Sequence, residues 1–366
     1  MDIRIHQLLH CIEQLAPPSY QESYDNSGLI TGNASWSCTG ALLSLDCTES
    51  VVEEAIASSC NLIIAHHPIV FAGMKKLTGA DYVQRTVIKA IQNNIAIYAC
   101  HTNLDNVQNG VNRKIGEKLG LKQLRILQPK EGILRKLVTF VPQSHHQKVL
   151  DALFAAGSGC IGNYDSCSFN VEGTGTFRGN ADSTPFLGEA GKLSHEKEIR
   201  IEVVFESPYQ SRLKEALLAS HPYEEVAFDI YPLANTHPAV GSGMIGEWDN
   251  GVDEEAFLKQ VKACFKAGVL KHTAFTGKPI KKVAFCGGSG SFLLKEAIRK
   301  GADAYITADL KYHEFFDADA RLLLVDTGHF ESEQFTPEIF YDCIRKNFPT
   351  FAIHLSKTNT NPINYF

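Results

Sequence analysis

The segment Asn61-Leu-Ile-Ile-Ala-His-His-Pro68 ends a short apolar run with two adjacent histidines, and the organisation of the chain can be worked out from it. Side chains alternate across a β-strand, so neighbouring residues inside a sheet point to opposite faces. At the end of a strand, two consecutive imidazoles can instead lean over one cleft, and each can bind a different metal ion. An isolated His-His pair is more often a partly exposed strand end, so His66 and His67 alone leave both interpretations open.

Two further segments carry metal-binding side chains at comparable places. His101-Thr-Asn-Leu-Asp105 and Asp326-Thr-Gly-His-Phe-Glu-Ser-Glu333 each follow a β-like apolar run. Imidazole and carboxylate groups of this kind suit divalent transition metals. Because three such segments occur, the metal-binding interpretation of His66 and His67 is favoured over the structural one. Together the segments predict a two-metal centre.

The first third of the chain alternates strands with helices. Strand patterns cover residues 40–45, 62–65 and 95–100, and helical patterns cover 49–58 and 81–93. Strands separated by helices of this length imply right-handed crossovers and a mainly parallel sheet. Ligands of such sheets gather at the carboxyl ends of the strands. The candidate residues at those ends are His66, His67, His101 and Asp105.

The last third of the chain repeats this plan. Its strand patterns lie at residues 282–286, 304–308 and 321–325. The segment Glu54–His67 aligns without a gap with Glu296–Asp309, which puts Asp309 in the place of His67. We infer a weak internal duplication whose halves face each other across the metal cleft, although chance similarity of two helix–strand units explains the alignment equally well.

Residues from about 130 to 235 break the pattern. Their elements follow the order strand, helix, strand, strand, helix, strand, with a Gly-rich bend expected near residues 173–175. This is the order of a ferredoxin-like sandwich, whose neighbouring termini allow insertion into a loop. The predicted fold class is therefore α/β. Two similar α/β halves, residues 1–128 and 237–366, form one metal-binding core, and residues 129–236 form an inserted ferredoxin-like α+β domain.

His329 and Glu333 are four residues apart, so a helix that begins at Gly328 places both side chains on one face. Glu333 could then bridge two ions while each ion also binds imidazole nitrogen, and Asp105 supplies another anionic oxygen. These donors fit Zn, Fe(II), Mn or Co, and the absence of thiolates among them leaves the metal undecided. We expect two divalent metal ions per subunit.

Several other residues near the cleft have two interpretations each. His101 is either a metal ligand or a residue that supports a ligand, and the supporting role is favoured. Asp46 could hold a ligand histidine or simply cap the helix that follows it, and Asp326 could also orient a ligand. Both His101 and Asp46 are candidate proton carriers in catalysis.

Two polar segments could meet a substrate. Gly287-Gly-Ser-Gly-Ser291, expected as a turn between strand and helix, could cradle a phosphate with backbone donors, but a tight structural turn is favoured. Lys311 or His313 could contact a substrate anion, while the simpler interpretation is that both are solvated surface residues.

Composition excludes some classes of function. The chain has 366 residues and a formal net charge of −6, with no basic footprint, so direct nucleic-acid binding is not expected. Ten cysteines without a C-x-x-C motif mostly fit buried thiols rather than disulfides. The chain opens without a signal-peptide pattern, and no apolar stretch approaches the roughly 18 residues that span a bilayer. We therefore expect a cytoplasmic protein.

The complete motif set resembles the Nif-three-like dinuclear metal-centre family, whose bacterial members are often labelled type 2 homologues of GTP cyclohydrolase I. The motifs are His-His-Pro68, His101–Asp105, Gly328–Glu333, Asp25-Asn-Ser-Gly-Leu29 and Asp309-Leu-Lys-Tyr-His313. The segment His221–Pro232 is similar to the insert of longer members, which looks like a CutA or PII type of ferredoxin-like domain. Ser27 departs from the larger apolar residue that is common in the family's turn motif.

The resemblance implies metal ligands, an assembly and a reaction class. It assigns the ligands to His66, His67, Asp105, His329 and Glu333, with Glu333 bridging, and implies a toroidal homohexamer. A two-metal centre can activate water and stabilise an oxyanion, which favours a metal-dependent hydrolase that acts on a nucleotide or cyclic amide. In a GTP-cyclohydrolase-like reaction, hydroxide would attack C8 of the purine. The alternative is a non-catalytic metal-binding or partner-binding regulator, with the insert as its interaction or sensing domain.

Overall fold

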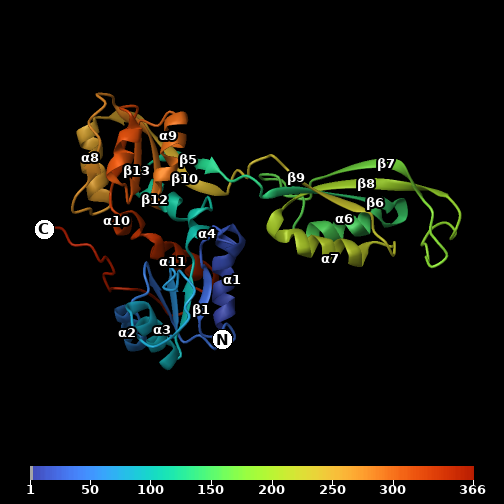
Figure 1. The fold of residues 1–366 in the computed structure, drawn as a ribbon, viewed down its shortest axis with the longest axis horizontal. Helices are drawn as coiled ribbons and strands as arrows, with labels where there is room; N and C mark the ends of the chain where they lie inside the picture. The colour runs from blue at the N-terminus through green and yellow to red at the C-terminus, as the bar shows by residue number, and fades with distance from the viewer. Residues whose placement is uncertain (1–2) are drawn as a thin grey trace. The chain divides into compact units, whose positions relative to one another are not determined.

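The computed structural model describes residues 3–366, and the chain divides into two compact units (Figure 1). Unit 1 combines the residues up to Pro129 with Ala239–Phe366, and unit 2 is Lys130–Pro238. Helices and strands are mixed, and the strands form three sheets, so the α/β class predicted from the sequence is confirmed. Within residues 3–366, no helix has both the length and the apolar character that crossing a bilayer requires.

The first sheet of unit 1 has five strands in the order β1-β4-β3-β2-β15. Its strands are β1 (Gly28–Thr31), β2 (Ala41–Ser44), β3 (Leu62–Ala65), β4 (Ala96–Ala99) and β15 (Ile353–Leu355). All are parallel except β1, which runs antiparallel to β4. Every residue of β2, β3 and β4 is buried, as expected for apolar parallel strands that are covered on both faces.

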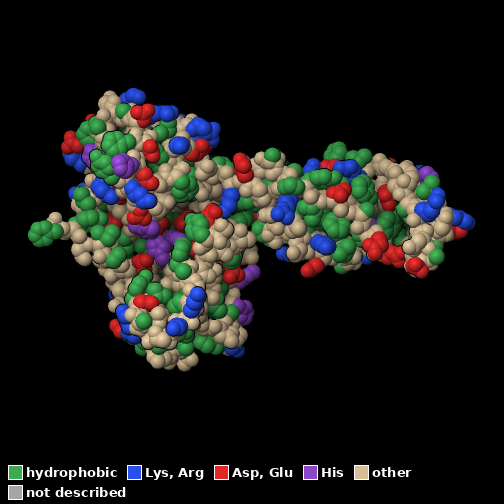
Figure 2. Space-filling model, in the orientation of Figure 1, with side chains coloured by type: hydrophobic (Ala, Val, Ile, Leu, Met, Phe, Trp, Pro, Cys, Tyr) green, Lys and Arg blue, Asp and Glu red, His purple; other side chains and the backbone are tan. Residues whose placement is uncertain are grey.

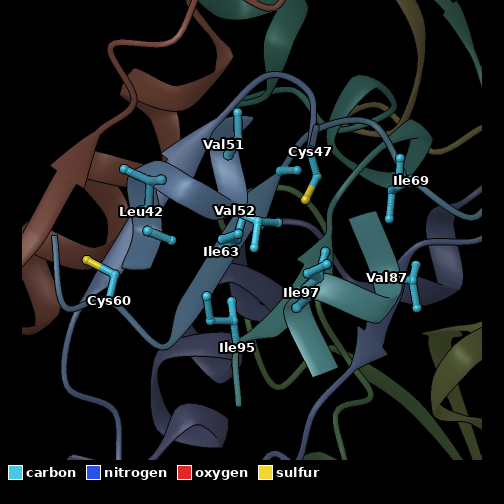
Figure 3. Packing of buried hydrophobic residues seen from close by; sticks show 13 residues of the cluster. Leu42, Cys47, Val51, Val52, Cys60, Ile63, Ile69, Val87, Ile95 and Ile97 are labelled. Carbon is cyan, nitrogen blue, oxygen red and sulfur yellow. The ribbon is translucent and has the colours of Figure 1, made fainter. Parts of the chain in front are cut away.

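Helices supply the cover for this sheet. Helices α2 (Glu49–Ala57), α3 (Tyr82–Gln92) and α11 (Thr336–Asn347) contact its strands, while α1 (Ile5–Leu15) packs against α11 and the short helix η1 (Pro18–Tyr20) against the segment Thr102–Asp105. Val51 and Val52 of α2 join one buried cluster with Leu42 and Ile63 of the strands (Figure 3). Helix α11 contacts α1, β2 and β15. A helix and a strand from near the end of the chain therefore complete a sheet whose other strands come from its first hundred residues.

The second sheet of unit 1 has six strands in the order β11-β14-β13-β12-β10-β5. They are β5 (Lys122–Pro129), β10 (Gly241–Val252), β11 (Lys271–His272), β12 (Ile280–Ser289), β13 (Ala304–Ala308) and β14 (Leu323–Asp326). β12, β13 and β14 are parallel to one another, and the other pairs are antiparallel. The helices around it are α4 (Thr102–Asp105), α5 (Val111–Lys118), α8 (Glu254–Cys264), η4 (Ser291–Leu293), α9 (Leu294–Arg299), η5 (Tyr312–Ala318) and α10 (His329–Glu333).

The Gly-rich segment 287–291 corrects one expectation. The sequence pattern predicted a turn there, but β12 continues to Ser289, which pairs with Ala308 of β13. The chain turns only at Gly290, immediately before η4. A long-range strand partner therefore overrides the local preference of glycine for a turn.

Strands β5 and β10 are antiparallel neighbours, and Gly241 lies opposite Pro129. The chain leaves unit 1 after Pro129 and re-enters it at Ala239. Unit 2 is therefore inserted at the place where a hairpin turn would otherwise join two adjacent strands.

Unit 2 has one antiparallel sheet with the strand order β7-β8-β6-β9. Its elements are β6 (Leu134–Pro142), η2 (Gln143–His145), α6 (His146–Ala155), β7 (Ser168–Phe177), β8 (Ser194–Glu206), η3 (Ser207–Tyr209), α7 (Gln210–Ser220) and β9 (Phe228–Pro232). Leu153 of α6 and Leu217 of α7 pack with Leu137 and Ile201 of the sheet. The bend expected near residues 173–175 is absent, because every residue of β7 pairs with β8.

Candidate metal centre

His66 and His67 directly follow β3, at the carboxyl end of the parallel strands. The His66 side chain is fully buried, and its Nδ1 lies 2.8 Å from the carbonyl oxygen of Cys100, to which it donates. The Nδ1 of His67 donates to Oδ1 of Asp46 over 2.7 Å. Because both Nδ1 atoms donate to protein oxygens, Nε2 is the nitrogen of each imidazole that is left for a ligand in the centre.

The opposite side of the centre comes from the short helix α10, as the spacing of His329 and Glu333 predicted. Gly328 precedes the helix with a φ of +90°, a backbone conformation that favours glycine, and an added Cβ would lie 2.2 Å from Oε2 of Glu331. The Nδ1 of His329 lies 2.6 Å from Oδ2 of Asp309, which follows β13. Glu333 is buried one turn further along.

Glu333 lies between two groups of side chains and turns one carboxylate oxygen toward each. Its Oε2 is 3.1 Å from Nε2 of His67 and 3.1 Å from Nε2 of His329. Its Oε1 is 3.9 Å from Nε2 of His66, which in turn is 3.5 Å from Oδ1 of Asp105. In each group, the three donor atoms lie within 4.8 Å of one another. All five residues predicted as ligands are therefore brought together in unit 1.

The donor set fits two cations. Nε2 of His66 and Oδ1 of Asp105 are both buried without a hydrogen-bond partner among the described residues, and leaving such an atom unpaired costs about 1–3 kcal/mol. Nε2 of His67 and Nε2 of His329 face each other at 3.3 Å, although both rings already donate through Nδ1. Lone pairs and carboxylates that converge in this way are stabilised by positive charge between them.

The pKa values of these groups indicate how strongly the pocket favours positive charge. Burial lowers the pKa of His67, but its bonds with Asp46 and Glu333 outweigh burial and raise the pKa to about 9. The pKa of His329 rises to about 11, because Asp309 and Glu333 outweigh its burial in the same way. Burial, together with the charge of Glu333, raises the pKa of Asp105 to about 7.

The Glu333 carboxyl behaves in the opposite way. Burial alone would raise its pKa, but the interactions with the neighbouring imidazoles of His329, His66 and His67 hold the pKa well below its usual range. Glu333 is therefore an anion that the surrounding imidazoles keep charged inside the protein.

His101 lies beside both strand-end histidines. Its ring centroid is 5.3 Å from that of His66 and 5.4 Å from that of His67, and the three rings form a further group that could hold a metal. Its Nδ1 donates to Oδ1 of Asp25 over 2.8 Å, so Nε2 is free. His101 can thus serve the centre either as a donor or as a proton carrier.

Asp25 is a functional neighbour that sequence reasoning treated only as part of a turn. Its Oδ2 accepts from the backbone NH and the hydroxyl of Thr102 and from the hydroxyl of Ser27, 3.0 Å away. Burial would raise the pKa of Asp25, but the bonds with His101 and Thr102 outweigh it and lower the pKa. The sequence feature that points to Asp25 is its position in the motif Asp25-Asn-Ser-Gly-Leu29, one of the motifs on which the family resemblance rests.

The structure distinguishes the two roles considered for Asp46, which were to cap helix α2 or to hold a histidine. Thr48 caps helix α2 with its hydroxyl, which accepts from the NH of Val51. Asp46 instead holds His67, and the bond to His67 outweighs burial to lower the pKa of Asp46.

Among the described residues, the groups of donor atoms that could hold a metal do not include Asp326, Lys311 or His313. The Asp326 carboxylate accepts from Lys271, Leu310 and Gly328, so it shapes the backbone and does not orient a histidine. Lys311 and His313 are both exposed.

The Gly-rich strand end offers no phosphate cradle. The NH groups of Gly287, Gly288 and Gly290 donate to side chains of the protein. A Cβ at Gly288 would lie 2.6 Å from Oε1 of Glu333. The glycines therefore allow the strand to pack tightly against the metal centre.

A patch of histidine side chains bordered by acidic ones is visible on unit 1 in the space-filling view (Figure 2). Residues 3–362 match the sequence profile of the Duf34/NIF3 (NGG1p interacting factor 3) family. The chain belongs to this family. The resemblance inferred from the motif set is thereby confirmed.

Named relatives and a solved structure agree with the family assignment. The chain is 40% identical over 325 residues to the GTP cyclohydrolase 1 type 2 homolog of Halalkalibacterium halodurans, a match that covers 88% of this chain and 87% of the relative. It is 36% identical over 365 residues to the protein of the same name from Bacillus subtilis, covering 98% of each chain. A Bacillus cereus protein related to NIF3 has the same fold, with a TM-score of 0.83, 34% identity and full coverage of both chains.

Proposed function

We propose that the protein binds two divalent metal ions, Zn, Fe or Mn, and is a metal-dependent hydrolase. The observation that carries this proposal is the position of Glu333, whose two oxygens each face a separate group of donors. One ion would be held by His66, Asp105 and Glu333, and the other by His67, His329 and Glu333. Bound there, the ions would lower the pKa of water and polarise a carbonyl, amidine or phosphate group of the substrate.

Carboxylates fix the orientation of the two imidazoles that share one ion. Asp46 holds His67 and Asp309 holds His329, each through Nδ1. Partners of this kind keep the tautomer and the ring plane suited to binding. The main-chain carbonyl of Cys100 does the same for His66.

Of the two candidate proton carriers, His101 is the better one. Both oxygens of Asp46 are occupied, by His67 and by the hydroxyl of Thr360. His101 has a free Nε2 beside the centre, and Asp25 fixes its other nitrogen. Its ring can therefore take or give a proton at Nε2 while keeping its position.

This role predicts a separation of metal binding from turnover. Replacing His101 by Gln should leave both ions bound but lower turnover by about 10²–10⁴-fold. Metal content per subunit and turnover of a substrate found by screening would be measured together. Unchanged turnover would exclude His101 as the proton carrier.

The substrate class that we propose is a nucleotide or a cyclic amide, and the reaction that we propose is GTP-cyclohydrolase-like. The names of the relatives from Halalkalibacterium halodurans and Bacillus subtilis support this choice. The test is metal analysis of protein purified without added metal, followed by an activity screen over nucleotides and cyclic amides. If Asp105→Ala and Glu333→Ala lose the metals but keep full turnover, the proposal is wrong.

We also propose that unit 1 consists of two similar halves and that unit 2 is a ferredoxin-like insert of the CutA or PII type. The element order and antiparallel sheet of unit 2 support the second point. The family resemblance further suggests a homohexamer, which light scattering would test. Ten thiols without a disulfide in residues 3–366 support a reducing, cytoplasmic location.

The alternative function, a regulator that senses a ligand through unit 2, is favoured by one observation. A hollow of about 610 Å³ lies on unit 2, within the usual range for small-molecule sites. Its walls include Phe140, Phe177, Phe186 and Tyr223. Replacing residues 130–235 with a short turn discriminates the two functions. Retained turnover supports the enzyme, whereas no turnover at any stage and loss of every phenotype support the regulator.

A further inference from the structure

The residues after β15, 356–366, form an extended strap that contains no helix or strand. The NH of Ser356 donates to the carbonyl oxygen of Leu43 over 2.8 Å, and beyond this backbone bond side-chain carboxylates hold the strap to the rest of unit 1. Its first anchor is Glu54 of α2, whose carboxylate accepts from the hydroxyls of Ser356 and Thr358 at 2.6 Å each. The backbone NH of Lys357 donates to the same carboxylate over 2.8 Å.

The second anchor reaches the metal centre. The hydroxyl of Thr360 donates to Oδ2 of Asp46 over 2.6 Å, and Oδ1 of the same carboxylate accepts from Nδ1 of His67 over 2.7 Å. Each oxygen of Asp46 therefore has one strong partner. The two bonds together fix the rotation of the carboxylate, and the carboxylate fixes the ring of His67.

The third anchor lies on the opposite half of the centre. Glu331 is buried in α10, two residues from both His329 and Glu333. Its Oε1 accepts from the amide of Asn361 over 3.1 Å and from the hydroxyl of Tyr365 over 3.3 Å. The strap thus fastens the five-residue helix that supplies two of the proposed ligands, and so short a helix is marginal without outside support.

We propose that the strap is a positioning element of the metal centre and that Thr360 is the positioning residue for His67, acting through Asp46. This inference rests on the proposed metal-binding function. The side chain of Asp46 is 31% exposed, so without Thr360 its carboxylate is free to turn toward water. The imidazole of His67 then loses a fixed partner, while His66, held by the carbonyl of Cys100, is unaffected.

The ion shared by His67 and His329 is therefore the one that depends on the strap. In Thr360→Val, stepwise titration of the full-length protein with Zn²⁺ should show about tenfold weaker binding of one ion and unchanged binding of the other. Thr360→Ser keeps the hydroxyl and should restore the wild-type affinities. Thr358→Val is the matched control: it removes a hydroxyl bond of equal length, but Glu54 still holds the strap through Ser356 and Lys357, so neither affinity should change.

Two background variants assign the affected ion. In Asp105→Asn, which leaves the His67 group intact, adding Thr360→Val should weaken the remaining ion about tenfold. In His329→Gln, which leaves the His66 group, the same addition should have no effect. If Thr360→Val does not fold by circular dichroism, Thr360→Ala makes the same test without added bulk at the Cγ position.

Equal weakening by Thr358→Val and Thr360→Val, or no change in Thr360→Val, would overturn the role of Thr360. Failure of the ligand assignment has a different signature. In that case Asp105→Asn and His329→Gln would each still bind two ions with wild-type affinity, whatever residue stands at position 360.

Discussion

The two sheets of unit 1 each position a histidine of the candidate metal centre by the same kind of contact, but at different places. In the first sheet, Asp46 follows β2 and holds His67, which follows the neighbouring strand β3. In the second sheet, Asp309 follows β13 and holds His329, which follows the neighbouring strand β14. In each half, an aspartate at one strand end fixes a histidine at the next.

The difference between the halves lies in which strands are used. Sequence alignment sets Asp309 opposite His67, yet Asp309 acts as the counterpart of Asp46. If β3 and β13 correspond, the Asp–His pair of the second sheet lies one strand further along than the pair of the first sheet. Residues at aligned positions in the two sheets therefore need not have the same role. Here the role of each aspartate is set by the histidine at the end of the neighbouring strand, not by the residue with which the aspartate aligns.

Glu333 belongs to both groups of donor atoms and is the proposed bridging ligand, so its replacement should have the largest effect. Glu333→Gln replaces a charged carboxylate by a neutral amide between the two donor groups, so both ions should bind more than about 100-fold more weakly. Inductively coupled plasma mass spectrometry and Zn²⁺ titration would measure this. Loss of only one ion would show that Glu333 serves a single group.

A substitution at Gly288 tests whether the close packing of β12 against Glu333 is needed for metal binding. It has a φ of +59°, and a Cβ would lie 2.6 Å from Oε1 of Glu333, so Gly288→Ala should displace that carboxylate and weaken both ions. Gly301→Ala is the matched control, because Gly301 has a φ of +70° with no atom within 4 Å of an added Cβ. The control should lose about 1 kcal/mol of stability and bind metal normally. Equal metal affinity in the two variants would argue against close packing at Gly288.

The paired aspartates give the sharpest test of the comparison itself. Asp46→Ala and Asp309→Ala should each weaken the ion held by His67 and His329 by about 10–100-fold. The other ion should bind as in the wild type. Under the proposed ligand assignment both aspartates would support the same ion, so the weakening in the double variant should be less than the product of the two single effects, as titration would show. Weakening of different ions would break the proposed equivalence.

Replacing Thr48 tests whether the cap of helix α2 is independent of the contact between Asp46 and His67. Its effect on metal binding should be the smallest of these variants. Thr48→Ala removes the hydroxyl that accepts from the NH of Val51, which should cost about 1 kcal/mol in urea unfolding. Metal affinity should stay unchanged. A loss of metal binding comparable to that in Asp46→Ala would mean that the cap and the support are not independent.

Local pattern was enough to predict much of the centre. His66, His67, His101 and Asp105 were expected at strand ends because apolar runs stop just before them, and the spacing of His329 and Glu333 predicted a shared helix face. Asp25 and Thr360 could not be found in this way. Their partners lie 76 and 314 residues away in the chain, so no local pattern records the contact.

The same limit applies to the fold. The alternation of strands and helices predicted an α/β protein, but not that β15 and α11 would join the first sheet. Nor did it predict the length of β12, because glycines normally favour a turn and only the pairing of Ser289 with Ala308 keeps the strand extended.

The insertion of unit 2 between β5 and β10 has a consequence for how this chain can vary. Gly241 lies opposite Pro129, so the ends of the inserted segment are already held side by side by a strand pair of unit 1. Lengthening a flexible connection adds only about 0.6 kcal/mol for each doubling of its length. The strand pair β5–β10 can therefore keep its register with an insert of a different length at this point, or with a turn of a few residues.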